Sequence, residues 1–161
     1  MMPTRIHRTA QRRRRPTTLS LARAAAIQSF CGDPTHPRTL LRKADLHRYF
    51  PTLFQAGLPT GYYVDATGSQ PILGHIRVDV GLDEVGRIVS RCHKLVRRHQ
   101  RVPGFRQLMA AGQFEITYLV ATEEKARRLS SAFGLVAKTG VRCVAVPIPS
   151  LLDRLALLPA T

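Results

Sequence analysis

The segment from residue 62 to residue 149 alternates predicted strands and helices, and this order constrains the fold more than any other feature of the sequence. Residues 62–65 and 72–80 favour β-structure and flank the turn-forming stretch TGSQP, which predicts a β-hairpin. The apolar run 114–121 predicts a buried central strand, and 141–149 predicts a further strand. Helical patterns between these strands predict an α/β fold with a mixed sheet of about four strands flanked by helices.

Helix signals precede and separate the strands. Residues 82–99 place apolar side chains at intervals of three and four, with basic side chains on the opposite side. Thr122 before two glutamates is typical of a capped helix start, and Thr17 or Thr18 has the same role near the N-terminus. Residues 31–39, with two prolines and a glycine, are expected to form a loop. We expect helices at 19–30, 40–50, 82–99, 105–112, 122–135 and 150–158.

Positive charge dominates the composition, with 25 Lys and Arg against 10 Asp and Glu and a formal net charge of +15. Such a chain attracts polyanions, and DNA is the partner that we expect first, because each neutralised phosphate releases condensed counterions. RNA or an acidic protein partner would respond to the same field. Membrane binding is not expected, since no long apolar face accompanies the charge and no apolar run approaches the roughly 18 residues of a membrane span.

The charge is concentrated first at the N-terminus. Residues 1–16 hold six arginines and no acid, so we expect a disordered arm that binds a polyanion. Residues 17–58 are expected to form a short helical region, and residues 59–161 the α/β body. A helix-turn-helix across 17–50 is disfavoured, because the proline-containing gap between its helices is longer than the turn of that motif.

A second basic surface is expected on the helix at 82–99, which has no acid after Glu84. Its basic stripe can hold a phosphate backbone without reading sequence, and a merely solvated helix face is the alternative. Tyr62 and Tyr63 could stack on bases, although strand tyrosines also serve as core packing. The expected nucleic-acid contacts are Arg12, Arg13, Arg14, Arg15, Arg77, Arg87, Arg91, Lys94 and Arg98.

The stretch LGHIRVDVG, residues 73–81, alternates apolar and polar side chains. His75, Arg77 and Asp79 therefore share one face of the predicted strand. A row of this kind is either a solvated strand face or the floor of a site that handles phosphate or a metal.

The three cysteines, Cys31, Cys92 and Cys143, are scattered and form no CxxC pair. An odd number without that spacing argues against a disulfide framework and for a reducing compartment. We therefore expect a cytoplasmic protein with core or surface thiols.

Three stretches carry a family resemblance: RVDVG with Asp79, CHKL with Lys94, and LVATEEKARRL at 119–129. In their order, residues 59–149 resemble the replication-relaxation proteins of bacterial plasmids and other mobile elements. Those proteins join a winged helix to a domain related to the PD-(D/E)XK nucleases. The resemblance implies a restriction-endonuclease-like fold, DNA as the partner and a mobile element as the source.

The resemblance also implies a metal site. Nucleases of this type bind Mg²⁺ between two acids and use a lysine beside the attacking hydroxide. Here Asp65 and Asp79 would be the metal ligands, Lys94 or Arg87 from the helix would replace the catalytic lysine, and Glu115 would be a further candidate acid. The strand carries Arg77 and Asp79 in an inverted order without a lysine, and the winged helix is absent or shortened. We therefore expect a DNA-binding protein whose nuclease-like site is lost or altered.

Two other functions stay open from the sequence. One is a Mg²⁺-dependent nuclease or nickase that uses Asp65, Asp79 and Lys94 in catalysis. The other is a basic RNA-binding or assembly factor. Against any metal site, Asp65 could belong to the turn, and Asp79 could pair with Arg77 or cap the following helix.

Overall fold

The computed structural model of the protein describes residues 17–53, 58–81, 83–134, 136 and 139–155. The expected arm at residues 1–16 lies outside the described residues, as do its candidate contacts Arg12, Arg13, Arg14 and Arg15. In chain order the elements are α1 (Thr18–Cys31), β1 (Arg38–Leu41), α2 (Lys43–Tyr49), the 3₁₀ turn η1 (Pro51–Leu53), β2 (Tyr62–Asp65), β3 (Ile72–Val78), α3 (Val85–Gln100), α4 (Pro103–Ala110), β4 (Phe114–Val120), α5 (Glu123–Phe133), β5 (Arg142–Pro147) and α6 (Ser150–Leu155).

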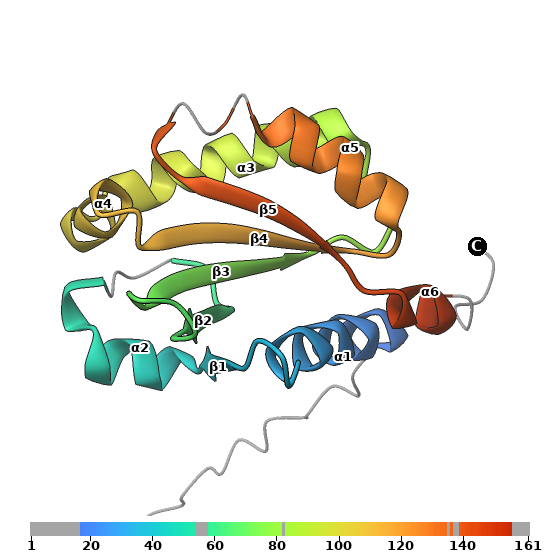
Figure 1. The fold of residues 1–161 in the computed structure, drawn as a ribbon, viewed down its shortest axis with the longest axis horizontal. Coiled ribbons are helices and arrows are strands. Elements are labelled where there is room, and N and C mark those ends of the chain that lie inside the picture. Colours follow the sequence, from blue (N-terminus) through green and yellow to red (C-terminus); the bar gives the residue numbers. More distant parts are fainter. Residues whose placement is uncertain (1–16, 54–57, 82, 135, 137–138, 156–161) are drawn as a thin grey trace, which may run out of the picture.

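The described strands form one five-stranded sheet in the order β1-β2-β3-β4-β5. β1, β2 and β3 are antiparallel neighbours, whereas β3, β4 and β5 run parallel. Parallel neighbours need crossover connections, which α3 with α4 supplies first and α5 supplies second. The predicted mixed α/β sheet with its hairpin and flanking helices is therefore confirmed (Figure 1).

The sequence prediction misses strand β1, and the number of strands it expected is too low. Residues 38–41 pair with β2, whereas their sequence favoured a loop followed by a helix from residue 40. Helix α2 begins only at Lys43, because the Asp45 carboxylate accepts a hydrogen bond of 2.9 Å from the backbone N–H of Arg42 and fixes the first turn there. Pairing across a sheet is a tertiary contact, and local periodicity carries no signal of it.

Each face of the sheet has its own apolar core. Helices α3, α4 and α5 pack on one face, where Ile116 of β4 and Phe105 of α4 are fully buried. Helices α1 and α6 cover the other face, where Leu119 of β4 and Leu151 of α6 are fully buried. Figure 1 shows these two helical layers on opposite sides of the strands. Because strand residues alternate between faces, β4 contributes apolar side chains to both cores.

The N-terminal segment is built into the sheet. Helix α1 packs against β1, β3, β4 and α6, and β1 forms one edge of the sheet. Thr17 caps α1 as expected, since its Oγ1 accepts a hydrogen bond of 3.2 Å from the N–H of Ser20. The boundary that the sequence placed between residues 58 and 59 therefore does not divide the described fold.

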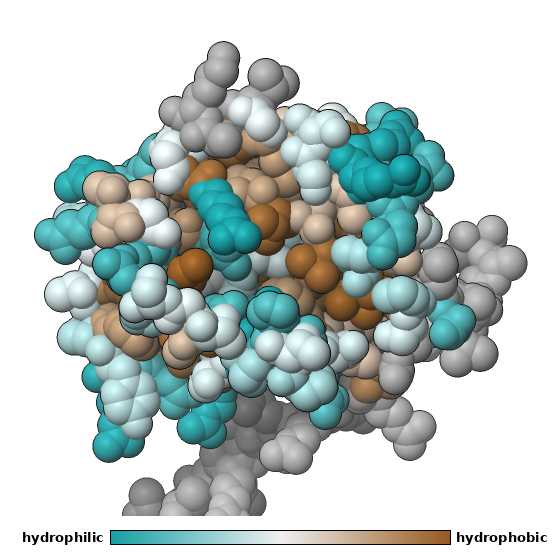
Figure 2. Space-filling model, viewed as in Figure 1, coloured by the Kyte–Doolittle hydropathy of each residue, from teal (hydrophilic) through white to brown (hydrophobic). Residues whose placement is uncertain are grey.

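Strand β5 forms the opposite edge of the sheet. Its residues from Cys143 to Pro147 are half-buried and are mostly apolar. Figure 2 shows brown apolar side chains interspersed with polar ones near the centre of the view, where β5 crosses the front of Figure 1. Within the described residues, no helix combines the length and the apolar character that crossing a membrane requires.

Candidate functional site

An open pocket with basic walls lies between α3 and the sheet. Its volume is about 250 Å³. We call it the basic pocket, and the residues that line it are Pro59, Arg77, Arg91, Lys94, Leu95, Arg98 and Tyr118. The four cations were all expected as nucleic-acid contacts from the sequence, and the structure brings them to one place.

The register of the strands explains why Arg77 reaches this pocket. β2 pairs with β3 only as far as Tyr62 opposite His75, and the N–H of Ile76 then donates to the Gly61 carbonyl at 2.8 Å. Among the described strands, the rest of β3 pairs with β4 alone. Arg77 is exposed in this stretch, directly opposite Tyr118 of β4.

Helix α3 supplies the other cations of the pocket. Arg91, Lys94 and Arg98 are three and four residues apart, so they lie along one side of the helix, and all are exposed. Ile88 and Val96 are buried against the sheet and fix the orientation of the helix. The predicted division of this helix into an apolar and a basic side is confirmed.

Asp83 divides the basic stripe of α3 into two parts. Its carboxylate forms ion pairs with Arg91 and, at 3.8 Å, with Arg87. Within the described part of the chain, no acid lies within ion-pair distance of Arg77, Lys94 or Arg98. The far end of the pocket therefore keeps uncompensated positive charge.

Beside the pocket, β3 and α3 contribute to a buried aromatic cluster, which we call the aromatic floor: Tyr62, His75, His99, Phe105 and Phe114. His75 has no exposed surface, so the polar row predicted on this strand does not form a solvated face at its first position. Its ring lies 4.9 Å from that of Tyr62 and 5.6 Å from that of His99, centroid to centroid. His75 is therefore part of the core through its ring contacts, although the strand pattern grouped it with the polar side chains Arg77 and Asp79.

The two histidines of the aromatic floor are neutral. Burial lowers the pKa of His75 to about 3, and the nearby His99 and Arg77 contribute to the shift. Burial also lowers the pKa of His99 to about 4. His99 Nδ1 donates to the Leu95 carbonyl at 2.8 Å, so its Nε2 accepts the hydrogen bond of 2.6 Å from the Tyr62 hydroxyl.

Asp79 lies at the carboxyl end of β3, and only a small part of its surface is exposed. It forms an ion pair with Lys125 of α5, and the same ammonium donates to the Asp83 carbonyl at 2.7 Å. Asp79 therefore pairs with Lys125 rather than with Arg77, Lys94 or a helix N-terminus. Lys125 is part of the stretch LVATEEKARRL in the sequence analysis, where it is assigned no role.

Asp65 lies at the other end of the hairpin. Its Oδ1 accepts the backbone N–H of Thr67 at 3.0 Å, and its Oδ2 lies 3.3 Å from Arg38 Nε. The hydrogen bonds from Thr67 and the charge of Arg38 lower its pKa against the opposing effect of burial. Asp65 thus serves the turn, as one of the sequence interpretations held.

The described residues do not fit the Mg²⁺ site that the resemblance implies. Asp65 lies opposite Ile72 at the start of β3, whereas Asp79 follows the end of that strand. Seven residues of strand separate the two positions by roughly 20 Å. Lys94 is exposed in the basic pocket. Among the described residues no cluster of three or more His, Cys, Asp or Glu side chains could hold a metal ion.

Glu115, the further candidate acid, lies on the opposite face of the sheet. It accepts a hydrogen bond from the Tyr63 hydroxyl and lies 3.5 Å from Arg142 Nε. The Tyr63 hydroxyl also contacts the Thr117 hydroxyl at 2.8 Å.

Tyr62 and Tyr63 are both buried, so neither is presented for base stacking, and the core-packing alternative is correct.

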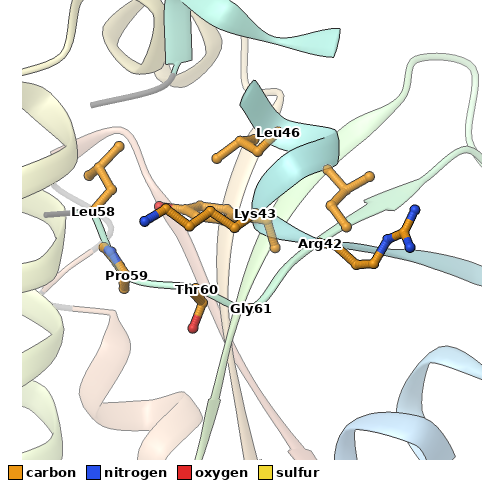
Figure 3. A pocket seen from close by; sticks show the side chains of 9 residues that line it. Arg42, Lys43, Leu46, Leu58, Pro59, Thr60 and Gly61 are labelled. Atoms are coloured by element: carbon orange, nitrogen blue, oxygen red, sulfur yellow. The ribbon is translucent and has the colours of Figure 1, made fainter. Parts of the chain in front are cut away.

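A smaller cavity lies between α2 and residues 58–61, with a volume of about 20 Å³. Figure 3 shows the Lys43 side chain lying toward Leu58 and Pro59 beside this cavity, while Arg42 extends away from it. A space of that size holds about one water molecule. It is therefore too small for a substrate, and the basic pocket is the better candidate site.

Two residues that shape the basic pocket had no role in the sequence analysis. Tyr118 was part of an apolar strand run, and only its register opposite Arg77 reveals its position. Asp83 precedes Arg87 by four residues, the spacing at which an acid pairs with a helix cation, whereas its ion pair with Arg91 spans eight residues. That spacing is visible in the sequence and could have divided the stripe in advance.

No protein-family model, curated protein or solved structure was found to match the chain. The function is therefore inferred from the geometry and the charge of these residues.

Proposed function

We propose that the protein binds DNA through the basic pocket and that its nuclease-like α/β fold does not cut the DNA. The observation that carries this proposal is the convergence of Arg77 from β3 with Lys94 and Arg98 from α3, with no described acid in ion-pair contact. Unpaired cations on two rigid elements bind phosphate oxygens and release counterions.

The character of the pocket favours a polyanion over a small molecule. Small-molecule sites are mostly apolar and enclose their ligand, with a few polar groups that orient it. Here the pocket is open, and four of its seven lining residues are exposed cations beside Pro59, Leu95 and Tyr118. A phosphate backbone suits such a site because it stays partly in solvent along its length.

The resemblance to replication-relaxation proteins supports a plasmid or another mobile element as the source. The free thiols of Cys31, Cys92 and Cys143 accord with a cytoplasmic location, where DNA is present and thiols stay reduced. A restriction-endonuclease-like ancestry accords with the mixed sheet and its helical layers. The separation of Asp65 from Asp79 supports a non-cutting protein.

Binding is tested with a short fluorescent DNA duplex and the variant Lys94→Gln/Arg98→Gln. Each lost phosphate contact costs about 1 kcal/mol after screening, so the loss of two should raise the dissociation constant roughly thirtyfold. The control is Arg23→Gln/Arg127→Gln, which removes two exposed cations outside the pocket and should change the affinity less than about threefold. Equal losses in both variants would contradict the proposal.

Two further measurements separate the alternatives. Supercoiled plasmid incubated with the protein and Mg²⁺ should stay uncut, whereas nicking that disappears in Asp79→Asn would favour the nuclease. Competition with RNA of the same sequence should displace the DNA weakly. Tighter binding of the RNA would favour the RNA-binding alternative.

A further inference from the structure

Two of the three cysteines lie side by side although they are 51 residues apart in the chain. The Sγ atoms of Cys92 and Cys143 are 3.4 Å apart. Cys92 comes from the buried side of α3, and Cys143 comes from the edge strand β5. Both are free thiols, and the sequence gave no reason to pair them.

The fold explains the contact. Cys143 lies opposite Ile116 of β4 in the parallel register, so it shares the face of the sheet that α3 covers. Cys92 is on the buried stripe of that helix. Cys31 packs at the margin of the core on the opposite face, so the third thiol is separated from the pair by the sheet.

We propose that Cys92 and Cys143 form an oxidant-sensitive dithiol that closes to an intramolecular disulfide linking α3 to β5. A disulfide bond is about 2.05 Å long, so the two sulfur atoms must approach by about 1.4 Å. Side-chain rotation with a small shift of the helix or of the edge strand accommodates this movement. The site is a modification site within the fold, independent of the proposed DNA binding.

The exposure of the two residues sets the order of the steps. Cys143 is half-buried and Cys92 has no exposed surface, so a small disulfide such as oxidised glutathione meets Cys143 first. The hydrogen bond with Cys92 and burial raise the pKa of the Cys143 thiol, but it is the accessible thiol of the pair. It loses its proton to solvent, and its sulfur attacks one sulfur of the oxidant. A mixed disulfide forms and one glutathione thiolate leaves.

Cys92 then completes the reaction. Its thiolate attacks Cys143 Sγ, the bond between Cys143 and glutathione breaks, and the second glutathione leaves as a thiolate that takes up a proton. Two protein thiols have then lost two electrons, and one oxidised glutathione has become two reduced molecules. In the reduced pair the hydrogen bond with the Cys143 thiol lowers the pKa of Cys92 against the effect of burial, and the Tyr118 hydroxyl adds to the lowering. Once Cys143 is in the mixed disulfide, the Tyr118 hydroxyl alone continues to favour the Cys92 thiolate.

The crosslink would fasten the helix that carries most of the basic pocket. Arg91 and Lys94 flank Cys92 in the sequence of α3, and Tyr118 lies between the thiol and the pocket. Oxidation therefore fixes one wall of the pocket relative to the sheet. An effect of oxidation on DNA binding would rest on the proposed function. The formation of the disulfide itself does not.

The test incubates the reduced full-length chain with oxidised glutathione, then unfolds it in denaturant and counts free thiols with a maleimide label by intact mass spectrometry. The Cys31→Ser variant should lose two labelled thiols without retaining glutathione, and dithiothreitol should restore both. Wild type should lose the same two thiols and can also carry glutathione on the half-buried Cys31. Cys92→Ser should retain one glutathione on Cys143. Cys143→Ser should keep an unmodified Cys92, because that thiol is buried.

Two results would overturn the proposal. One is a Cys31→Ser variant that carries glutathione on Cys143 and keeps a free Cys92 thiol. The other is a Cys31→Ser variant that retains both remaining thiols under conditions that oxidise a model dithiol peptide. Neither readout uses DNA, so failure here is distinguishable from failure of the proposed function.

Discussion

The aromatic floor and the basic pocket are neighbours to which β3 and α3 both contribute, yet their basic side chains differ in charge state. β3 gives His75 to the floor and Arg77 to the pocket, and α3 gives His99 to the floor and Arg98 to the pocket. The imidazoles are neutral because burial penalises their charge, whereas the exposed guanidinium groups stay charged. The position of a basic residue on its strand or helix therefore decides whether it can meet an anion.

Acid should disrupt the floor, with the largest effect that we expect. His75 and His99 have pKa values of about 3 and about 4 in the fold and 6.5 ordinarily. Well above pH 6.5 both are neutral whether folded or not. Below it the unfolded chain binds protons that the folded chain excludes, so the free energy of unfolding falls by up to about 2.7 kcal/mol per pH unit. Urea denaturation at pH 6.5 and at pH 4.5 should show that the free energy of unfolding falls by about 4 kcal/mol between them.

The variant His75→Phe is the control for this effect. It removes one of the two excluded protons, so the slope of stability against pH should fall to about 1.4 kcal/mol per unit. A wild-type stability that stays constant over the same pH range would show that the histidines are not held neutral.

Loss of the hydrogen bond within the floor should have a smaller effect. Tyr62→Phe removes the donor to His99 Nε2 and leaves that nitrogen buried without a partner. The free energy of unfolding should fall by about 1 to 2 kcal/mol, as measured by urea denaturation at neutral pH. Tyr49→Phe, at an exposed position, should change stability by less than about 0.5 kcal/mol. Equal losses would mean that the bond contributes nothing specific.

Removal of an acid should enlarge the pocket's positive surface. Asp83→Asn frees Arg87 and Arg91, so the affinity for a DNA duplex should rise about three- to fivefold, equivalent to about 1 kcal/mol. Asp33→Asn, in the loop after α1, makes the same change of charge away from the pocket and should leave the affinity nearly unchanged. A gain of the same size from both variants would indicate a response to total charge alone.

The sequence predicted most of the elements, because their signals are local. The Thr17 and Thr122 caps and the stripe of α3 are patterns within a few residues, and each was found where expected. Strand β1 was missed because its pairing with β2 is a contact between separate segments. The alternation in LGHIRVDVG correctly predicted a strand with His75 and Arg77 on one face. The burial of His75 could not be predicted, because it depends on the aromatic rings that surround it.

The candidate site was predictable in composition but not in arrangement. Lys94 and Arg98 followed from helical spacing, and Arg77 from the strand pattern. Their convergence depends on where β2 stops pairing with β3, which no local signal reports. The predicted partners of Asp79 were wrong for the same reason. Lys125 reaches Asp79 only because the crossover places α5 beside the end of β3.

The most direct test of the basic pocket is the salt dependence of DNA affinity in the variant Arg77→Gln/Lys94→Gln/Arg98→Gln. If the three cations each neutralise a phosphate, the slope of log affinity against log salt should become shallower by about 2.7 relative to wild type. The control Arg23→Gln/Arg106→Gln/Arg127→Gln removes as many exposed cations outside the pocket. Unchanged slope in the pocket variant, or the same change in both, would contradict the account.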